Sequence, residues 1–189
     1  MSDLLLTTLP KVLLPAFAIA IMLFVAKRRG ISLATGLGLQ KPLLKVAIIF
    51  LIAWLCLMTL EEYLTSGMAG AAVKNWPAYP PLILGLRILA LGLLGPIAEE
   101  LVSRGLLLHV LGRTRVGIYG AIVILAAAWA IIHVQYAPIL LTLIFIDGVV
   151  LGLARHFSRS LYVPITMHII GNLFSISLTM TRAQAVVRL

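Results

Sequence analysis

The sequence predicts an all-α protein, a polytopic transmembrane bundle of about six (six to seven) membrane helices. Three observations lead to this prediction. Of the 189 residues, 62% are hydrophobic and only 11% are charged, whereas a soluble domain is usually about a quarter charged. Several apolar runs approach the roughly 20 residues that a helix needs to cross a bilayer. The cations lie between these runs, as in loops that face anionic lipid, and form no single stripe that would bind nucleic acid.

Six apolar runs, taken in chain order, predict the spanning helices. The first stops at Lys27, Arg28 and Arg29 without a small-residue cleavage site, so it is expected to be a retained helix and not a signal peptide. The third contains Gly95 and Pro96, where proline removes a backbone donor and favours a kink or a fresh helix start. The predicted spans are 10–26, 42–60, 82–111, 116–136, 138–154 and 161–180.

A polar stretch over 61–81 separates the second run from the third. Its prolines and glycines, with Trp76 and Tyr79, favour an extramembrane loop with interfacial aromatic rings. We therefore expect N-terminal helices and a loop over 1–81, a second helix bundle over 82–181 and a C-terminal tail over 182–189. The single cysteine, Cys56, lies in an apolar run and cannot form an internal disulfide.

The distribution of cations orients the spans. By the positive-inside rule, the cation-rich side faces the cytoplasm and both termini lie outside. A break into two spans at Gly95-Pro96 would invert the later orientation. The richer side holds Lys27, Arg28, Arg29, Lys41, Lys45, Arg113, Arg115, Arg155 and Arg159, and the poorer side holds Lys11, Lys74, Arg182 and Arg188.

Three ionisable side chains interrupt the apolar third run: Glu99, Glu100 and Arg104. Each costs about 2.5–3.5 kcal/mol at mid-membrane on insertion scales, so they must face a wet cavity or neutralise one another. Glu100 and Arg104 are four residues apart on one helix face, which permits a purely structural ion pair. Glu99 points about 100° away from that face. Glu99 is therefore the candidate general base or acid, with Glu100 as its charge-balanced support.

Two histidines occupy comparable apolar surroundings, His133 and His168. Either one alone is as often a packing residue as a functional one. Trp129 lies one turn before His133, and Asn172 lies one turn after His168, so each pair shares a helix face. Asn172 is expected to fix the His168 tautomer or to donate to a developing oxyanion, and Trp129 to keep water out. We expect the Glu99 carboxyl and both imidazoles to converge on one water or ion.

In their order along the chain, these motifs resemble the CAAX protease and bacteriocin-processing family, also called the Abi or CPBP family, over about 82–180. Each motif alone is common by chance, but three in order within hydrophobic helices are specific. Trp129 departs from the phenylalanine common at its position, which affects the shape of the pocket more than its chemistry. The motifs are Glu99-Glu100-x-x-x-Arg104, Trp129-x-x-x-His133 and His168-x-x-x-Asn172.

This resemblance implies an intramembrane endopeptidase that attacks peptide bonds with an activated water. Glu99 and His133 would activate the water, and His168 and Asn172 would hold it or stabilise the oxyanion. Glu100 and Arg104 would complete the first motif. Zinc or another divalent metal is an alternative way to activate the water, with Glu99, His133 and His168 as ligands and a fourth position open. We favour a water held directly by Glu99 and His133.

The partners implied by the resemblance are the lipid bilayer and a peptide or membrane-protein substrate, either a prenylated C-terminus or a bacteriocin precursor, in a bacterial inner membrane. Two other functions stay open. One is a transporter or proton relay, because buried ionisable groups mark ion pathways; the other is a non-catalytic scaffold of the same fold. Asp147 is expected to contact Arg87 or Arg155 on a neighbouring helix, and His109 and His156 to be interfacial.

Overall fold

The computed structural model describes residues 2–66 and 79–187, with side chains over 3–66 and 79–181. Over these ranges the chain forms helices and turns without a strand, which confirms the all-α prediction. In this part of the chain, five helices are long and apolar enough to cross a membrane, and one is shorter. They are α1 (Ser2–Arg28), α2 (Leu44–Thr65), a composite helix Pro81–Leu111, α6 (Gly117–Ile131), α7 (Pro138–Ser158) and α8 (Tyr162–Val187). Lys74, Trp76 and Arg188, for which sequence predictions were made, lie outside the described residues.

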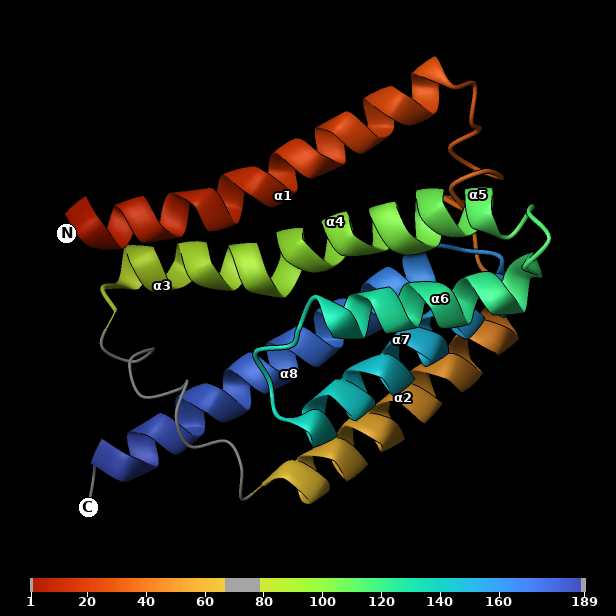
Figure 1. Ribbon diagram of the computed structural model, residues 1–189. Helices are drawn as coiled ribbons and strands as arrows, with labels where there is room; N and C mark the ends of the chain where they lie inside the picture. The colour runs from red at the N-terminus through yellow and green to blue at the C-terminus, as the bar shows by residue number, and fades with distance from the viewer. Residues whose placement is uncertain (1, 67–78, 188–189) are drawn as a thin grey trace.

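The helices run back and forth between two ends of the bundle. Figure 1 shows α1 lying along the composite helix, with α2, α6, α7 and α8 on the other side of that helix. The start of α1 and the end of α8 lie at one end of the bundle, as the six-span prediction requires. We call the opposite end the basic end. It holds the end of α1 with Lys27 and Arg28, the connector 30–43 and the α7–α8 turn.

The composite helix passes through Gly95-Pro96 without ending. It consists of α3 (Pro81–Ile88), the π-helical segment η2 (Leu89–Leu94), α4 (Gly95–Glu100), a second π-helical segment η3 (Leu101–Leu107) and α5 (Leu108–Leu111). Pro96 follows the π-helical segment η2 inside this continuous helix and contributes no backbone N–H donor there. The alternative of two separate spans at this point is therefore wrong, and the π-helical geometry absorbs the irregularity.

Several helix bounds differ from those predicted: α1 begins at Ser2, α7 ends at Ser158 and α8 ends at Val187. Two further differences, in α2 and α6, affect the candidate site. Helix α2 runs on to Thr65 and therefore includes Glu61 and Glu62, which the sequence placed in a loop. Helix α6 ends at Ile131 and not near 136. Its 15 residues span about 22 Å at 1.5 Å per residue, less than the roughly 30 Å of a hydrocarbon core. His133 therefore lies in the turns beyond the helix.

Helices α6 and α7 pack closely along their lengths. Two glycines four residues apart on α7 let the backbones approach. A Cβ on Gly148 would lie 2.8 Å from the Cβ of Ala126, and a Cβ on Gly152 would lie 2.7 Å from Ile122 Cγ2. Small residues at this spacing are typical of close helix pairs in membranes. The pairing fixes the position of α6, including Trp129 near its end.

Apolar side chains cover much of the outer surface. Phe17 is 65% exposed, Ile49 65% and Ile131 66%. Exposed apolar area of this extent would be unstable in water, and it suits a lipid environment. The apolar surface and the helix lengths together define an integral, multi-pass membrane protein.

Candidate active site

The short helix α4 turns two neighbouring glutamates in different directions. Glu100 is fully buried, whereas the Glu99 side chain is 43% exposed. The hydroxyl of Ser103 donates to the Glu99 backbone carbonyl within the π-helical segment η3. One carboxyl therefore faces the interior of the bundle and the other faces an open space.

Glu100 joins the composite helix to α8. Its Oε1 accepts a hydrogen bond from Arg104 Nη1 at 2.8 Å and contacts His168 Nδ1 at 3.0 Å. The other guanidinium nitrogen, Arg104 Nη2, donates to the Gly148 carbonyl on α7 at 3.0 Å. Because a carboxylate can only accept, Nδ1 of His168 carries the hydrogen. Glu100 therefore fixes the His168 tautomer and leaves Nε2 directed at other groups.

Glu99 lies on the other side of the His168 ring. Its Oε2 accepts a hydrogen bond from Trp129 Nε1 at 3.0 Å and lies 3.9 Å from His168 Nε2. The sequence assigned Trp129 only the role of a wall against water, whereas its indole also donates to the candidate base. The Trp129 ring meets the rings of His133 and His168 edge to face, with centroids 5.6 and 5.3 Å apart.

His133 is held by the backbone of α6. Its Nδ1 lies 2.7 Å from the carbonyl oxygen of Trp129. A carbonyl oxygen only accepts, so Nδ1 carries the hydrogen and Nε2 keeps its lone pair. A neutral imidazole with a free Nε2 can accept a hydrogen bond from water.

These side chains meet at one cavity of about 640 Å³. Glu99, His133, His168 and Asn172 all line it, so the structure brings together both imidazoles, the candidate base and the amide. Glu100 and Arg104 do not line the cavity and lie behind the His168 ring, where Arg104 is 2% exposed. The short helix α6 accounts for the meeting, because it ends early enough to bring His133 to the depth of His168.

Asn172 does not contact His168 Nδ1 as predicted. Its Nδ2 donates to the carbonyl oxygen of Leu91 at 2.7 Å, in the π-helical segment η2, and Glu100 occupies the place beside His168 Nδ1 that Asn172 was expected to fill. An amide nitrogen carries two hydrogens. One hydrogen therefore ties α8 to the composite helix, and the other is available to the cavity.

Sequence reasoning missed an acidic pair in the same cavity. Glu61 and Asp147 both line it, and one carboxyl oxygen of each is buried without a hydrogen-bond partner in the described part of the chain. The predicted partners of Asp147 were wrong, because Arg87 donates instead to Thr8 at 3.1 Å and Arg155 lines a different pocket. The sequence signal for Asp147 was an acidic residue within an apolar run. Glu61 was missed because the predicted end of α2 came before it.

The proposed metal ligands do not form a recognisable metal site. Among the described residues, no group of three or more His, Cys, Asp or Glu side chains is arranged to hold an ion. His133 and His168 each use Nδ1 for a hydrogen bond, to the Trp129 carbonyl and to Glu100, and keep Nε2 free. Each free Nε2 can accept a hydrogen bond from water.

Apolar spanning helices around carboxylates and imidazoles that line one cavity define a class, the polytopic membrane proteins with a polar site among their helices. The sequence model of the family described as Type II CAAX prenyl endopeptidase Rce1-like matches residues 81–174, a range that contains every predicted site residue. The chain belongs to this family of peptidases. Neither a curated protein nor a solved structure matches the chain significantly.

Proposed function

We propose that this protein is an intramembrane endopeptidase that cleaves membrane-associated peptides in the cavity beside Glu99. One observation carries the proposal: the Glu99 carboxylate and the rings of His133 and His168 line the same cavity, with Glu99 3.9 Å from His168. Family membership supports peptide-bond hydrolysis as the reaction class. A base next to two imidazoles supplies the groups that such hydrolysis needs.

In the proposed reaction, a water donates one hydrogen bond to Glu99 and the other to His133 Nε2. Glu99 removes a proton, the hydroxide attacks the substrate carbonyl carbon, and the carbonyl π electrons move to the oxygen. The free amide hydrogen of Asn172, in the cavity wall, stabilises this oxyanion, and His168, whose Nε2 keeps a lone pair, helps to position the water beside Glu99. When the C–N bond breaks, the leaving nitrogen takes the proton from Glu99, so atoms and charge balance.

Glu100 and Arg104 act through His168. Glu100 holds Nδ1 at 3.0 Å, and Arg104 balances the buried charge. A buried carboxylate without a cation would be very costly. These two residues therefore position the site and do not touch the substrate. For the substrate, we propose a peptide with a prenylated CAAX C-terminus, because the chain matches a family of CAAX prenyl endopeptidases.

The test uses the full chain, purified in detergent and incubated with a farnesylated CAAX peptide. Glu99→Gln should lower kcat by about 100-fold or more, since general-base catalysis typically contributes 10²–10⁴. Asp3→Asn, an acid-to-amide change at the start of α1, should cleave at the parent rate. A parallel incubation with a chelator should leave cleavage unchanged. Parent-like cleavage by Glu99→Gln would refute the assignment of Glu99.

A proton relay is the second candidate, because Glu61 and Asp147 add carboxyls to the same cavity and carboxyls in membrane helices often mark ion pathways. Reconstituted vesicles with an internal pH dye separate the two functions. The relay predicts proton flux without peptide, and that flux should fall in Asp147→Asn. The peptidase predicts cleavage without flux.

A further inference from the structure

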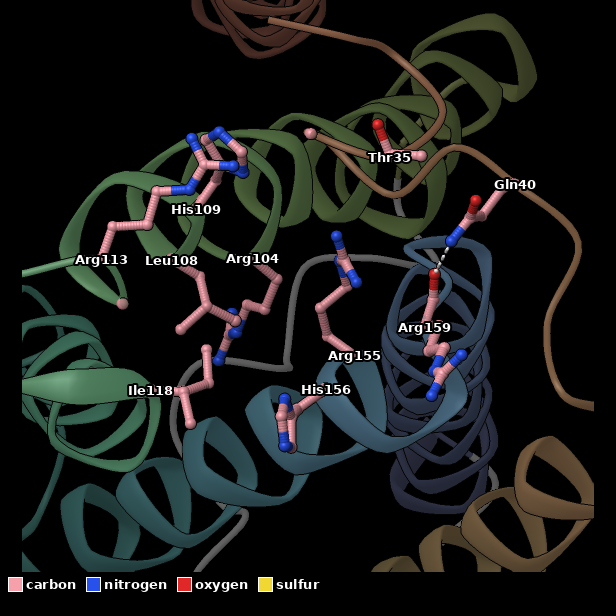
Figure 2. A pocket seen from close by; sticks show the side chains of 12 residues that line it. Thr35, Gln40, Arg104, Leu108, His109, Arg113, Ile118, Arg155, His156 and Arg159 are labelled. Atoms are coloured by element: carbon pink, nitrogen blue, oxygen red, sulfur yellow. Dashed lines mark hydrogen bonds between the residues drawn. The ribbon is translucent and has the colours of Figure 1, made fainter.

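A second pocket of about 350 Å³ lies at the basic end, away from the candidate active site. Figure 2 shows its side chains, which come from the composite helix and the turn after it, from α6, from α7 and the turn after it, and from the connector 30–43. Apart from Arg104, which also pairs with Glu100, none of its lining residues belongs to the predicted site or to the proposed reaction. Its ionisable lining consists of Arg104, His109, Arg113, Arg155, His156 and Arg159.

The charge of this pocket is strongly one-sided. The chain has six acidic residues, and none of them lines the pocket. Arg104 is neutralised by Glu100. Arg113, Arg155 and Arg159 form no ion pair within the described part of the chain. Three guanidinium groups with two imidazoles therefore share a small volume without a counter-charge from the protein.

The pocket shows signs of a built site. Arg155 lies partly buried against the connector at Gly38, and its Nε is buried without a hydrogen-bond partner. Gly38 has φ +82°, and a Cβ there would collide with the Arg155 guanidinium. A buried donor without an acceptor costs about 1–3 kcal/mol, and more for a charged group. Arg155 also has no counter-charge beside it among the described side chains, and an anion in the pocket would offset that charge.

The neighbouring backbone is held in place by hydrogen bonds. Arg159 adopts a left-handed conformation with φ 60°, and its carbonyl accepts from Gln40 Nε2 at 2.8 Å, the contact drawn in Figure 2. Leu161 N donates to the Gly38 carbonyl at 2.7 Å. These bonds tie the connector to the α7–α8 turn, so both walls of the pocket keep their spacing.

The lining specifies the chemistry of the ligand. Guanidinium groups bind phosphate oxygens through paired, charge-assisted hydrogen bonds. His109, Arg113 and Arg155 line the same pocket, so these three groups can act on the same anion. The pocket is at the end of the bundle predicted to face the cytoplasm, where membranes present anionic headgroups.

We propose that the pocket at the basic end binds a phosphate group, carried either by the headgroup of an anionic phospholipid or by a free phosphate compound. The phosphate oxygens accept hydrogen bonds from Arg113, Arg155 and Arg159. Binding is measured without peptide cleavage, so the outcome is independent of the proposed peptidase function.

The experiment uses the full chain in detergent and measures bound lipid by native mass spectrometry after mixing with phosphatidylcholine and phosphatidylglycerol. A second arm titrates inorganic phosphate in phosphatidylcholine alone and follows thermal unfolding. Arg113→Gln should weaken binding about tenfold, the loss expected for one charge-assisted hydrogen bond. Arg115→Gln is the matched control, because Arg115 is an exposed cation two residues away that does not line the pocket.

Preferential retention of phosphatidylglycerol identifies a lipid headgroup as the carrier of the bound phosphate. Stabilisation by inorganic phosphate identifies a free phosphate compound instead. Either result supports the proposal if Arg113→Gln loses it and Arg115→Gln keeps it. Arg155→Lys is a second test variant, because it keeps the positive charge and loses the planar guanidinium with its paired donors. It should also bind the phosphate group more weakly. Equal binding by the parent and Arg113→Gln would overturn the proposal. Equal loss of binding in Arg113→Gln and Arg115→Gln would also overturn it.

Discussion

Trp129 holds more of the candidate site than any other single side chain described above. Its indole N–H donates to Glu99 at 3.0 Å, and its ring lies 5.0 Å from the Arg104 guanidinium. Its backbone carbonyl oxygen accepts a hydrogen bond from His133 Nδ1. The donated hydrogen bond and the packing of the ring are separate contributions. Because Glu99 is 43% exposed, water can replace the indole donor but cannot replace the ring.

We therefore expect two substitutions of Trp129 to differ. Trp129→Phe keeps an aromatic ring and should lower kcat about threefold, since water restores most of the lost hydrogen bond. Trp129→Ala also removes the ring packed against both histidines and should lower kcat about 100-fold, because small displacements at an active site have effects of this order. Steady-state cleavage of the farnesylated peptide measures both. Similar losses in the two variants would contradict this division.

The buried Glu100–Arg104 pair predicts a stability effect. Arg104→Met leaves Glu100 at 0% exposure without its cation, and breaking such a pair typically costs about 3–5 kcal/mol. Unfolding in detergent with increasing denaturant measures the loss. The double variant with Glu100→Gln removes the unpaired charge and should recover most of the stability. A double variant as unstable as Arg104→Met would show that the cost lies in the packing.

At the scale of helices, the sequence predicted the presence and order of the spans better than their ends. Apolar runs report which residues tolerate lipid, so the composite helix was found almost to the residue. Glu61 and Glu62 were mistaken for loop because polarity marked the end of the run, although α2 continues to Thr65. Helix α6 stops at Ile131 although apolar residues follow. Composition does not encode where a backbone turns.

For the candidate site, the sequence predicted which residues take part but not all of the contacts that they make. The motif spacings selected residues that line or support one cavity, since three-residue and four-residue separations on a helix fix a common face. The contacts between helices were not accessible. That Asn172 binds the Leu91 carbonyl depends on the π-helical segment η2, and no local sequence rule used here predicts such a segment. Contacts of this kind depend on tertiary packing.

The pairing of α6 with α7 gives a prediction for a single methyl group. Gly148→Ala places a Cβ 2.8 Å from the Cβ of Ala126 and 3.3 Å from the Trp129 ring. Such overpacking costs about 1–3 kcal/mol and should also lower kcat by displacing Trp129. Gly85→Ala is the matched control, because no atom lies within 4 Å of its added Cβ. Thermal unfolding and cleavage assays should show losses in Gly148→Ala alone, and equal behaviour of the two variants would sink the packing argument.

For the whole molecule, the two ends of the bundle differ in charge, and this difference bears on orientation. Cations gather at the basic end, around the pocket that contains Arg113 and Arg155. Acids gather around the other cavity, where Glu61, Glu99 and Asp147 line the wall. The positive-inside rule counts Lys and Arg near the helix ends and gives acids little weight. The basic end should therefore face the cytoplasm, and the cavity of the candidate site should lie on the side of both termini.

This orientation is testable with single cysteines. In a Cys56→Ser background, Arg115→Cys marks the basic end and Asp3→Cys marks the opposite end, since both positions are exposed. In intact cells, a membrane-impermeant maleimide should label Asp3→Cys and leave Arg115→Cys unlabelled until the membrane is opened. Replacing one cation with cysteine leaves most of the charge bias in place, so the substitutions should not reverse the protein. Labelling of Arg115→Cys in intact cells would place the phosphate pocket outside and remove the headgroups of the cytoplasmic leaflet as its ligand.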